Sequence, residues 1–340
     1  MRKLFITGGA GFIGSAFVRL ALAELSDCQI INFDALTYAG NLYNLTGVGE
    51  SRHSFLRGDI ANREAVLAAL EEGTDAIVHF AAESHVDRSI ERADEFLRTN
   101  VIGTQVLLDA ARERKVRRFC LISTDEVMGS LAEGEDEFFT EESPCAPNSP
   151  YAASKAAAEH LVRAAHHTFA LDAVITRCGN NYGPRQFPEK FIPLILSNAL
   201  NDEPVPLYGD GLNVRDWIYV DDHCRAILQI LERGRCGEIY NIGARNERRN
   251  IDVALAILDA LGKPHSLIRN VKDRLGHDRR YAIDPTKVER ELDWRPLETW
   301  ETGLAKTIQW YSENTAWVER ARSGAYRDYY ARQYGVEARL

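Results

Sequence analysis

The sequence lacks the long apolar runs and the cysteine patterns that are typical of membrane proteins and metal-binding proteins. No apolar run approaches the roughly 20 residues that a membrane-spanning helix needs, and the run at the N-terminus is too short for a signal peptide. The six cysteines are scattered, without a CxxC pair or a Cys/His spacing that suits zinc. We therefore expect a cytoplasmic protein with reduced thiols, no bound metal and no membrane association.

Positive charge is also in short supply. Lysine and arginine number 41 against 50 aspartates and glutamates, which gives a formal net charge of -9 at pH 7. This balance argues against a general nucleic-acid or anionic-membrane surface, so any phosphate must be bound by local groups. The length of 340 residues favours two lobes, because single cores stop growing near about 250 to 300 residues.

A glycine-rich turn near the N-terminus is the strongest motif. Residues 3–7 are predicted to form a buried parallel strand, residues 8–14 read GGAGFIG, and a helical pattern follows over residues 15–25. In this context backbone N–H groups and a helix N-terminus bind the pyrophosphate of a dinucleotide. The next strand, residues 29–33, ends in Asp34, where an acid accepts hydrogen bonds from the adenosine ribose and repels a 2′-phosphate. The expected cofactor is NAD rather than NADP.

Strands and helices alternate through the first half of the chain. Further strands are predicted at 53–56, 76–80, 119–122 and 173–177, and helices at 63–71, 99–113 and 151–169. This rhythm predicts an α/β fold, a Rossmann-type doubly wound parallel sheet with a smaller C-terminal substrate-binding lobe. We place the NAD-binding domain at residues 1–180, with part of the C-terminal region returning to it, and the second lobe mainly at residues 181–340.

The second lobe has a less regular pattern. Prolines interrupt it, and residues 207–217 are predicted to form a hairpin followed by a strand. Residues 299–311 form an amphipathic helical pattern, and residues 313–334 are predicted to be a peripheral cap without an assigned role.

The stretch from residue 119 to residue 155 carries the catalytic candidates. Its strand ends in Thr124, Asp125 and Glu126, at the sheet edge where ligands bind, and two adjacent carboxyls there can divide the roles of acid and base. Tyr151 and Lys155 are four residues apart on a helix, so the ammonium can stabilise a phenolate. Each motif alone often occurs by chance or as a solvated turn, but their order after the glycine turn favours catalysis.

Other polar groups leave alternatives open. His85 could be a general base or a structural residue. Arg215 and the basic loop at residues 276–281 could bind an anionic ligand or form surface salt bridges.

Together these motifs resemble the extended short-chain dehydrogenase/reductase superfamily, and within it the dTDP-glucose 4,6-dehydratases. The resemblance extends over essentially the whole chain, including a tail near residues 317–335. Its discriminating feature is Thr124-Asp125-Glu126, because related epimerases and decarboxylases lack the Asp-Glu pair. Two positions depart from the pattern: Met128 stands where Tyr is usual, and Gly179 where Ser is usual.

The resemblance implies a redox-neutral dehydration of dTDP-glucose to dTDP-4-keto-6-deoxyglucose with a tightly held NAD. Tyr151, assisted by Lys155, would take the proton of the C4 hydroxyl, and Thr124 would hold the C4 oxygen. Glu126 would then remove the C5 proton while Asp125 protonates the departing C6 hydroxyl.

The resemblance also implies two sets of binding residues and a homodimer formed through the helices that begin near residues 100 and 151. The expected NAD-binding residues are Gly8, Gly11, Phe12, Ile13, Gly14, Asp34, Ala35, Leu36, Thr37, Asp59, Ile60, Phe80, Ala81, Ala82, Ser84, Thr99, Tyr151, Lys155 and Asn181. The expected nucleotide-sugar contacts are Ser84, Thr124, Asn180, Lys190, Phe191, Pro206, Leu207, Tyr208, Arg215, Asn250, His277, Asp278, Arg279, Arg280 and Tyr281.

Other functions remain as alternatives. A UDP-glucose 4,6-dehydratase would differ in recognising a base that lacks one methyl group, which a pocket distinguishes by only about 1 to 3 kcal/mol. A nucleotide-sugar 4-epimerase needs only the Tyr-Lys pair and NAD, so Asp125-Glu126 argues against it. A non-catalytic NAD-binding scaffold would have no use for the complete set.

Overall fold

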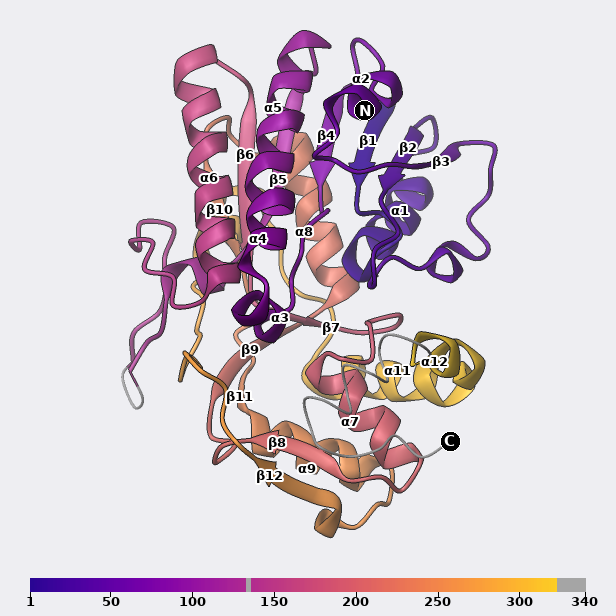
Figure 1. Cartoon of the computed structure of the whole chain (residues 1–340), viewed down its shortest axis with the longest axis vertical. Helices are drawn as coiled ribbons and strands as arrows, with labels where there is room; N and C mark the ends of the chain where they lie inside the picture. Colours follow the sequence, from indigo (N-terminus) through magenta and orange to yellow (C-terminus); the bar gives the residue numbers. More distant parts are fainter. Residues whose placement is uncertain (133–135, 323–340) are drawn as a thin grey trace.

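The computed structural model describes residues 1–132 and 136–322 of the chain, and a seven-stranded sheet forms its upper half (Figure 1). The strand order is β10-β6-β5-β4-β1-β2-β3, and every neighbouring pair is parallel. The strands are β1 (Lys3–Thr7), β2 (Gln29–Asp34), β3 (His53–Arg57), β4 (Ala76–His79), β5 (Arg118–Thr124), β6 (Ala173–Cys178) and β10 (Ile239–Ile242). The predicted doubly wound parallel sheet is therefore confirmed.

Two helical layers cover this sheet because its central strands are apolar on both faces. One buried cluster joins the sheet to α1 (Phe12–Glu24) and α8 (Val220–Arg233). The other joins it to the helices α2 (Arg63–Ala69), α5 (Thr104–Glu113) and α6 (Pro150–Phe169). Helix α8 and strand β10 come from the second half of the chain, so that half contributes to both lobes.

The helix predicted at residues 99–113 is longer and less regular than expected. Helix α3 (Val86–Glu91) and helix α4 (Ala93–Phe96) precede it, and a π-helical segment, Leu97–Gly103, connects α4 to α5. Apolar periodicity does not reveal this change in helix type, because π-helical turns shift the hydrogen bonds by only one residue.

The lower lobe is built on two small sheets. Strand β9 (Val214–Tyr219) lies between β7 (Asn180–Tyr182) and β11 (Glu247–Arg249), while β8 (Val205–Tyr208) pairs in parallel with β12 (Ile268–Val271). The predicted hairpin at residues 207–217 is thus wrong, because β8 and β9 pair with different partners. Pro206 has no N–H group, which suits the edge of a two-stranded sheet.

Helices pack around these small sheets in a third buried cluster. The expected amphipathic helix is α11 (Trp300–Glu313), and the others are α7 (Phe191–Leu200), α9 (Asn250–Ala260) and α12 (Thr315–Ala321). Helix α10 (Thr286–Leu292) instead packs in the cluster that joins α8 to the large sheet. In α12, Trp317 Nε1 donates to Asn44 Oδ1 at 2.9 Å and ties the lower lobe to the segment after β2. The remainder of the predicted cap lies outside the described residues. Over the described ranges, no helix is both long and apolar enough to cross a membrane.

Candidate active site

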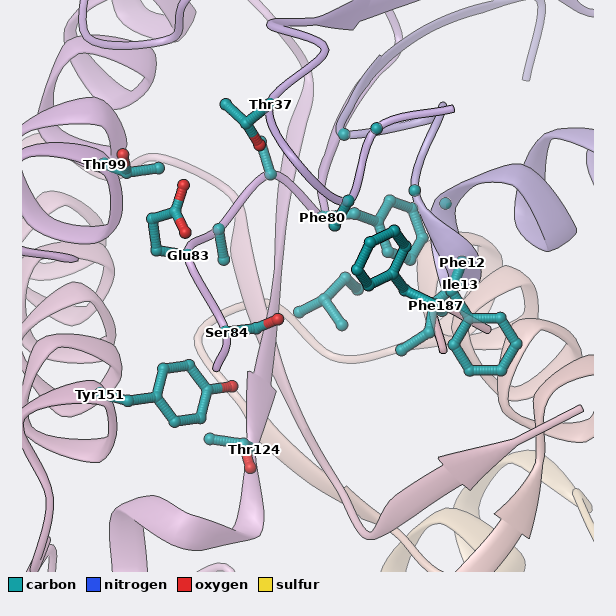
Figure 2. Close-up of a pocket in the computed structure, with 18 of the residues that line it drawn as sticks. Phe12, Ile13, Thr37, Phe80, Glu83, Ser84, Thr99, Thr124, Tyr151 and Phe187 are labelled. Atoms are coloured by element: carbon teal, nitrogen blue, oxygen red, sulfur yellow. The ribbon is translucent and has the colours of Figure 1, made fainter. Parts of the chain in front are cut away.

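A cavity of about 590 Å³ lies where the strands of the large sheet end (Figure 2). Residues at the carboxyl ends of β1 to β6 line it, together with the segment between β7 and α7. This is the edge where open α/β sheets bind ligands. The cavity therefore brings the glycine turn and the predicted catalytic residues into one site.

The glycine turn leaves no room for a side chain at Gly8 or Gly14. Gly8 has a φ of 73°, and a Cβ on Gly14 would lie 2.2 Å from the Gly8 carbonyl oxygen. Backbone N–H groups at the start of α1 can therefore approach a ligand closely, and the helix N-terminus favours a negative charge there. These features fit the diphosphate of a dinucleotide.

Asp34 is held in place beside this turn. Its Oδ2 accepts a hydrogen bond from Ala10 N at 2.9 Å, and its Oδ1 accepts one from Leu36 N at 2.8 Å. Burial raises the pKa of Asp34, and these two backbone donors oppose the increase. Each carboxylate oxygen keeps a second acceptor site, which fits the hydroxyls of an adenosine ribose. Leu36 itself, predicted to bind NAD, does not line the cavity.

A buried polar network holds the wall formed by residues 81–84. Asn100 accepts from Glu83 N at 2.9 Å and donates to Glu83 O at 2.9 Å and to Ser154 Oγ at 2.8 Å. Ser154 in turn donates to the Tyr151 carbonyl at 2.7 Å. Sequence reasoning missed Asn100 and Ser154 as supporting residues, because a single Asn or Ser in a helix carries no recognisable spacing.

Tyr151 and Lys155 point into the site from α6. Figure 2 shows the Tyr151 hydroxyl between Ser84 and Thr124. Burial raises the pKa of Tyr151 well above its usual value, and the carboxyl of Glu126 adds to the increase, while a hydrogen bond with Thr124 opposes it. Lys155 Nζ donates to Ile122 O at 2.7 Å, and burial lowers the pKa of Lys155 to about 8.

The two adjacent carboxyls have different surroundings. Asp125 is only 2% exposed, and Thr124 Oγ1 donates to its Oδ1 at 3.2 Å, whereas its Oδ2 has no hydrogen-bond partner among the described residues. Burial and then the neighbouring Glu126 raise the pKa of Asp125 well above its usual value. Burial also raises the pKa of Glu126, but the charges of Arg215 and Lys190 oppose that increase. These surroundings therefore favour the protonated form more strongly for Asp125 than for Glu126.

The predicted nucleotide-sugar residues divide into two groups. Ser84, Thr124, Asn180 and Lys190 line the cavity, and Lys190 Nζ donates to Ser84 O at 2.8 Å. The others lie outside the cavity lining: Phe191, Pro206, Leu207, Tyr208, Arg215, Asn250, His277, Asp278, Arg279, Arg280 and Tyr281.

The arginines of the second group differ in their partners. Arg279 pairs with Asp210 at 2.9 Å, and Arg280 pairs with Glu247 at 2.9 Å. Buried Arg215 instead lies 4.2 Å from the Tyr281 ring centre and donates to the Asp278 carbonyl at 2.9 Å, without an ion pair among the described residues. Arg215 therefore has the guanidinium best suited to an incoming anion.

His85, the alternative base, is buried away from the cavity lining. Its Nε2 lies 3.9 Å from Glu189 Oε2 and its Nδ1 lies 4.0 Å from Asp87 Oδ2. Burial lowers the pKa of His85 well below its usual value. This environment favours a structural role.

The two departures from the family pattern have packing explanations. Met128 is buried against Val127, Phe139 and Tyr281, so it fills space under the site. A Cβ on Gly179 would lie 2.7 Å from the Asp216 carbonyl oxygen, so glycine allows the close approach of two backbones here.

Several cavity residues carried no signal in the sequence. They come from loops and from regular elements whose meeting at one cavity could not be deduced from spacing, and they include Tyr38, Arg88, Glu95, Arg98, Cys178, Gln186, Phe187 and Glu189.

The parallel sheet, the glycine turn and the Tyr-Lys pair on α6 define an extended short-chain dehydrogenase/reductase. The chain belongs to the family described as GDP-mannose 4,6 dehydratase, which matches residues 5–307. The dTDP-glucose 4,6-dehydratase of Xanthomonas campestris pv. campestris (strain B100) is 51% identical over 347 residues, which cover 96% of this chain and 98% of the relative.

Solved structures show the same similarity. The dTDP-glucose 4,6-dehydratase of Streptomyces venezuelae, with NAD and TYD bound, has a TM-score of 0.91 and 51% identity, covering 94% of this chain and 99% of that chain. The UDP-glucose 4-epimerase of Thermus thermophilus, in complex with NAD, has a TM-score of 0.85 and 31% identity, covering 92% of this chain and 99% of that chain. This chain is thus more similar to the dehydratase than to the epimerase, both in sequence identity and in TM-score.

Proposed function

We propose that this protein is an NAD-dependent lyase that converts dTDP-glucose to dTDP-4-keto-6-deoxyglucose. One observation carries the proposal: the carboxyls of Asp125 and Glu126 adjoin Tyr151 in a cavity that also contains a dinucleotide-binding turn. An epimerase needs no such pair. The similarity to curated dTDP-glucose 4,6-dehydratases supports the same activity.

The residues present fit NAD. The glycine turn and the start of α1 would hold its diphosphate, and Asp34 would accept hydrogen bonds from the adenosine ribose. When bound, NAD supplies the oxidation at C4 and the reduction at C6. The acid at position 34 disfavours a 2′-phosphate, so NADP is not expected.

Tyr151 would act as the first base. Its phenolate oxygen would take the proton of the sugar C4 hydroxyl and become the neutral hydroxyl, and Thr124, beside it in Figure 2, would hold the C4 oxygen. The nearby positive charge of Lys155 favours the phenolate that this step requires. Because Lys155 Nζ is bound to the Ile122 carbonyl, its position on α6 is fixed before substrate arrives.

Asp125 and Glu126 would divide the elimination of water. A 4-keto group acidifies the C5 proton, and Glu126, whose charged form Arg215 and Lys190 favour, would remove it. Asp125, kept protonated by burial and by its neighbour, would donate a proton to the departing C6 hydroxyl. The stronger upward shift in the pKa of Asp125 is consistent with its role as the acid.

The nucleotide would extend from the cavity toward the lower lobe. Lys190 and Asn180 stand at the boundary, and Arg215 is the buried guanidinium beyond them. We retain the division into a cofactor domain at residues 1–180 and a substrate lobe mainly at residues 181–340 as part of this proposal. The remaining predicted contacts, from Phe191 to Tyr281, belong to it as well.

We further propose a homodimer in the cytoplasm. Apolar side chains are exposed on the helical layer that carries the predicted seam, with Leu97 53% and Ile102 55% exposed. Burial of these side chains against a second copy of the chain would favour dimerisation through the hydrophobic effect. All six cysteines are free thiols, which is usual in reducing compartments.

The activity is tested by NMR in deuterated water. The purified protein, without added NAD, is incubated with dTDP-glucose and separately with UDP-glucose. A 4-keto-6-deoxy product that carries deuterium at C5 is expected, from dTDP-glucose in preference to UDP-glucose. A C4 epimer, or unchanged substrate even after NAD is added, would refute the proposal.

A further inference from the structure

Three side chains from three separate segments meet in the wall of the cavity. Tyr38 follows β2, Arg88 lies on α3, and Glu189 precedes α7. All three line the same cavity as the glycine turn. None of the proposed chemical steps uses these three residues, so their contacts with one another suggest a role other than catalysis.

The three side chains are in close contact and are largely shielded from solvent. Arg88 Nη2 lies 3.0 Å from Glu189 Oε2, and the Arg88 guanidinium carbon lies 4.0 Å from the centre of the Tyr38 ring. The Glu189 side chain is 0% exposed and that of Arg88 is 25% exposed. A buried ion pair of this kind loses much when one partner is removed, because the other charge stays buried.

Phe187 extends this contact over the cofactor half of the cavity. Its ring packs edge-on against Tyr38, with the ring centres 5.8 Å apart. Figure 2 shows Phe187 beside Phe12, Ile13 and Phe80, on the opposite side of the pocket from Tyr151. The segment of Glu189 therefore lines the same cavity as the start of α1, where a diphosphate would bind.

Separating the three segments is electrostatically unfavourable, because the buried carboxylate of Glu189 would lose its positively charged partner. Burial raises the pKa of Glu189, and the charges of Lys190 and Arg88, with a hydrogen bond from Tyr38, oppose that increase. Moving the segment of Glu189 outward would break its ion pair with Arg88, its hydrogen bond with Tyr38 and the edge-on contact between Phe187 and Tyr38 together. The three contacts are thus coupled, and they resist separation of these segments of the cavity wall.

We propose that Tyr38, Arg88 and Glu189 form a clasp that holds these segments of the cavity wall together and slows the release of NAD. This inference rests on the proposed function, in which NAD ends each turnover in the state in which it began and has no need to leave. The three residues are positioning residues for cofactor retention and do not touch the reacting atoms.

The test measures NAD without any sugar nucleotide. Wild type, Glu189→Gln, Arg88→Gln, the double variant and Tyr38→Phe are purified, and bound NAD per chain and its exchange with radiolabelled NAD are measured. Asp172→Asn is the matched control, because it breaks a 3.0 Å ion pair with Arg118 at the other end of the sheet. Tyr38→Phe keeps the ring, so it provides a readout if a charge variant fails to fold.

We expect bound NAD to exchange about tenfold faster in Glu189→Gln and Arg88→Gln than in wild type. This factor corresponds to a decrease of about 1.4 kcal/mol in the activation free energy of NAD release. The double variant should resemble the single variants, because both remove the same contact. Tyr38→Phe should also exchange faster, and Asp172→Asn should match wild type. Exchange rates within about twofold of wild type in all clasp variants would overturn the proposal.

The failure of the clasp and the failure of the proposed function are distinguishable. If wild type retains NAD and the variants retain it equally well, only the clasp is refuted. If wild type retains NAD but forms no 4-keto-6-deoxy sugar, only the activity is refuted. If wild type binds no NAD, both are refuted.

Discussion

At the scale of single residues, two neighbouring carboxyls are made different by what surrounds them. Asp125 is enclosed, and one of its oxygens has no hydrogen-bond partner among the described residues. The charge of Arg215 opposes the pKa increase of both carboxyls, and that of Lys190 also opposes it for Glu126. The sequence shows only that the carboxyls are adjacent. The resemblance assigns Asp125 as acid and Glu126 as base, and the tertiary surroundings supply a physical reason for that order.

Changing Glu126→Gln should separate oxidation from elimination. The amide keeps the shape of the side chain but cannot take the C5 proton, so turnover should fall by about 10²- to 10⁴-fold. Stopped-flow absorbance should still show reduction of bound NAD by dTDP-glucose, and NMR should show no deuterium at C5. Turnover at the wild-type rate would mean that another group is the base.

The pH profile of kcat/KM should be bell-shaped. Glu126 must be charged, and because its pKa is raised above its ordinary 4.5, activity should be lost on acidification at a higher pH than for an ordinary glutamate. Asp125 must be protonated, so activity should fall again as the pH rises through its raised pKa. Activity that stays constant down to pH 4.5 in folded protein would contradict this assignment.

At the scale of elements, the first strand, turn and helix were predictable and the lower lobe was less so. The strand-glycine-helix order depends on local sterics, which the sequence states directly. The pairing of β8 and β9 depends on strands far away in the chain, β12 and β11, so a local turn signal suggested the wrong hairpin. Helix α8, which has an apolar stripe that includes Ile227 and Leu231, was missed although its periodicity was present.

A methyl group at Gly14 should disrupt the turn. In Gly14→Ala the new Cβ would meet the Gly8 carbonyl oxygen at 2.2 Å, and backbone cannot yield as a side chain can. We expect a loss of about 1 to 3 kcal/mol in the free energy of unfolding, measured in urea, and weaker NAD binding by calorimetry.

Gly49→Ala serves as the control for this change, since no heavy atom of the described residues lies within 4 Å of its Cβ position. Equal NAD affinity in Gly14→Ala and wild type would show that close backbone approach is not needed there.

At the scale of the whole molecule, two lobes meet at one cavity and a helical layer carries exposed apolar residues. Trp317 on α12 reaches Asn44 after β2, and Arg274 pairs with Asp87 at 2.6 Å, so contacts between segments far apart in sequence hold the lobes together. Leu97 and Ile102 are exposed on the layer that contains α5 and α6.

Charging this layer should separate the proposed homodimer. Ile102→Glu would bury a carboxylate in an apolar seam, and we expect dimerisation weakened by about 2 kcal/mol or more, roughly 30-fold. Light scattering after gel filtration over a dilution series would measure it. Leu297→Glu, at a side chain that is 73% exposed outside this layer, is the control. A wild-type monomer, or an Ile102→Glu dimer of unchanged affinity, would refute the seam.

The sequence alone determined the fold class, the cofactor preference and the residues proposed for catalysis, because each depends on local pattern: strand and helix periods, a glycine turn, an acid at position 34 and a Tyr-Lys spacing. Tertiary structure decided which residues share the cavity, which arginines are already paired, and why Asp125 and Glu126 differ. It also brought Tyr38, Arg88 and Glu189 together. The reason is physical: burial and long-range charge depend on neighbours distant in sequence, which no local spacing can specify.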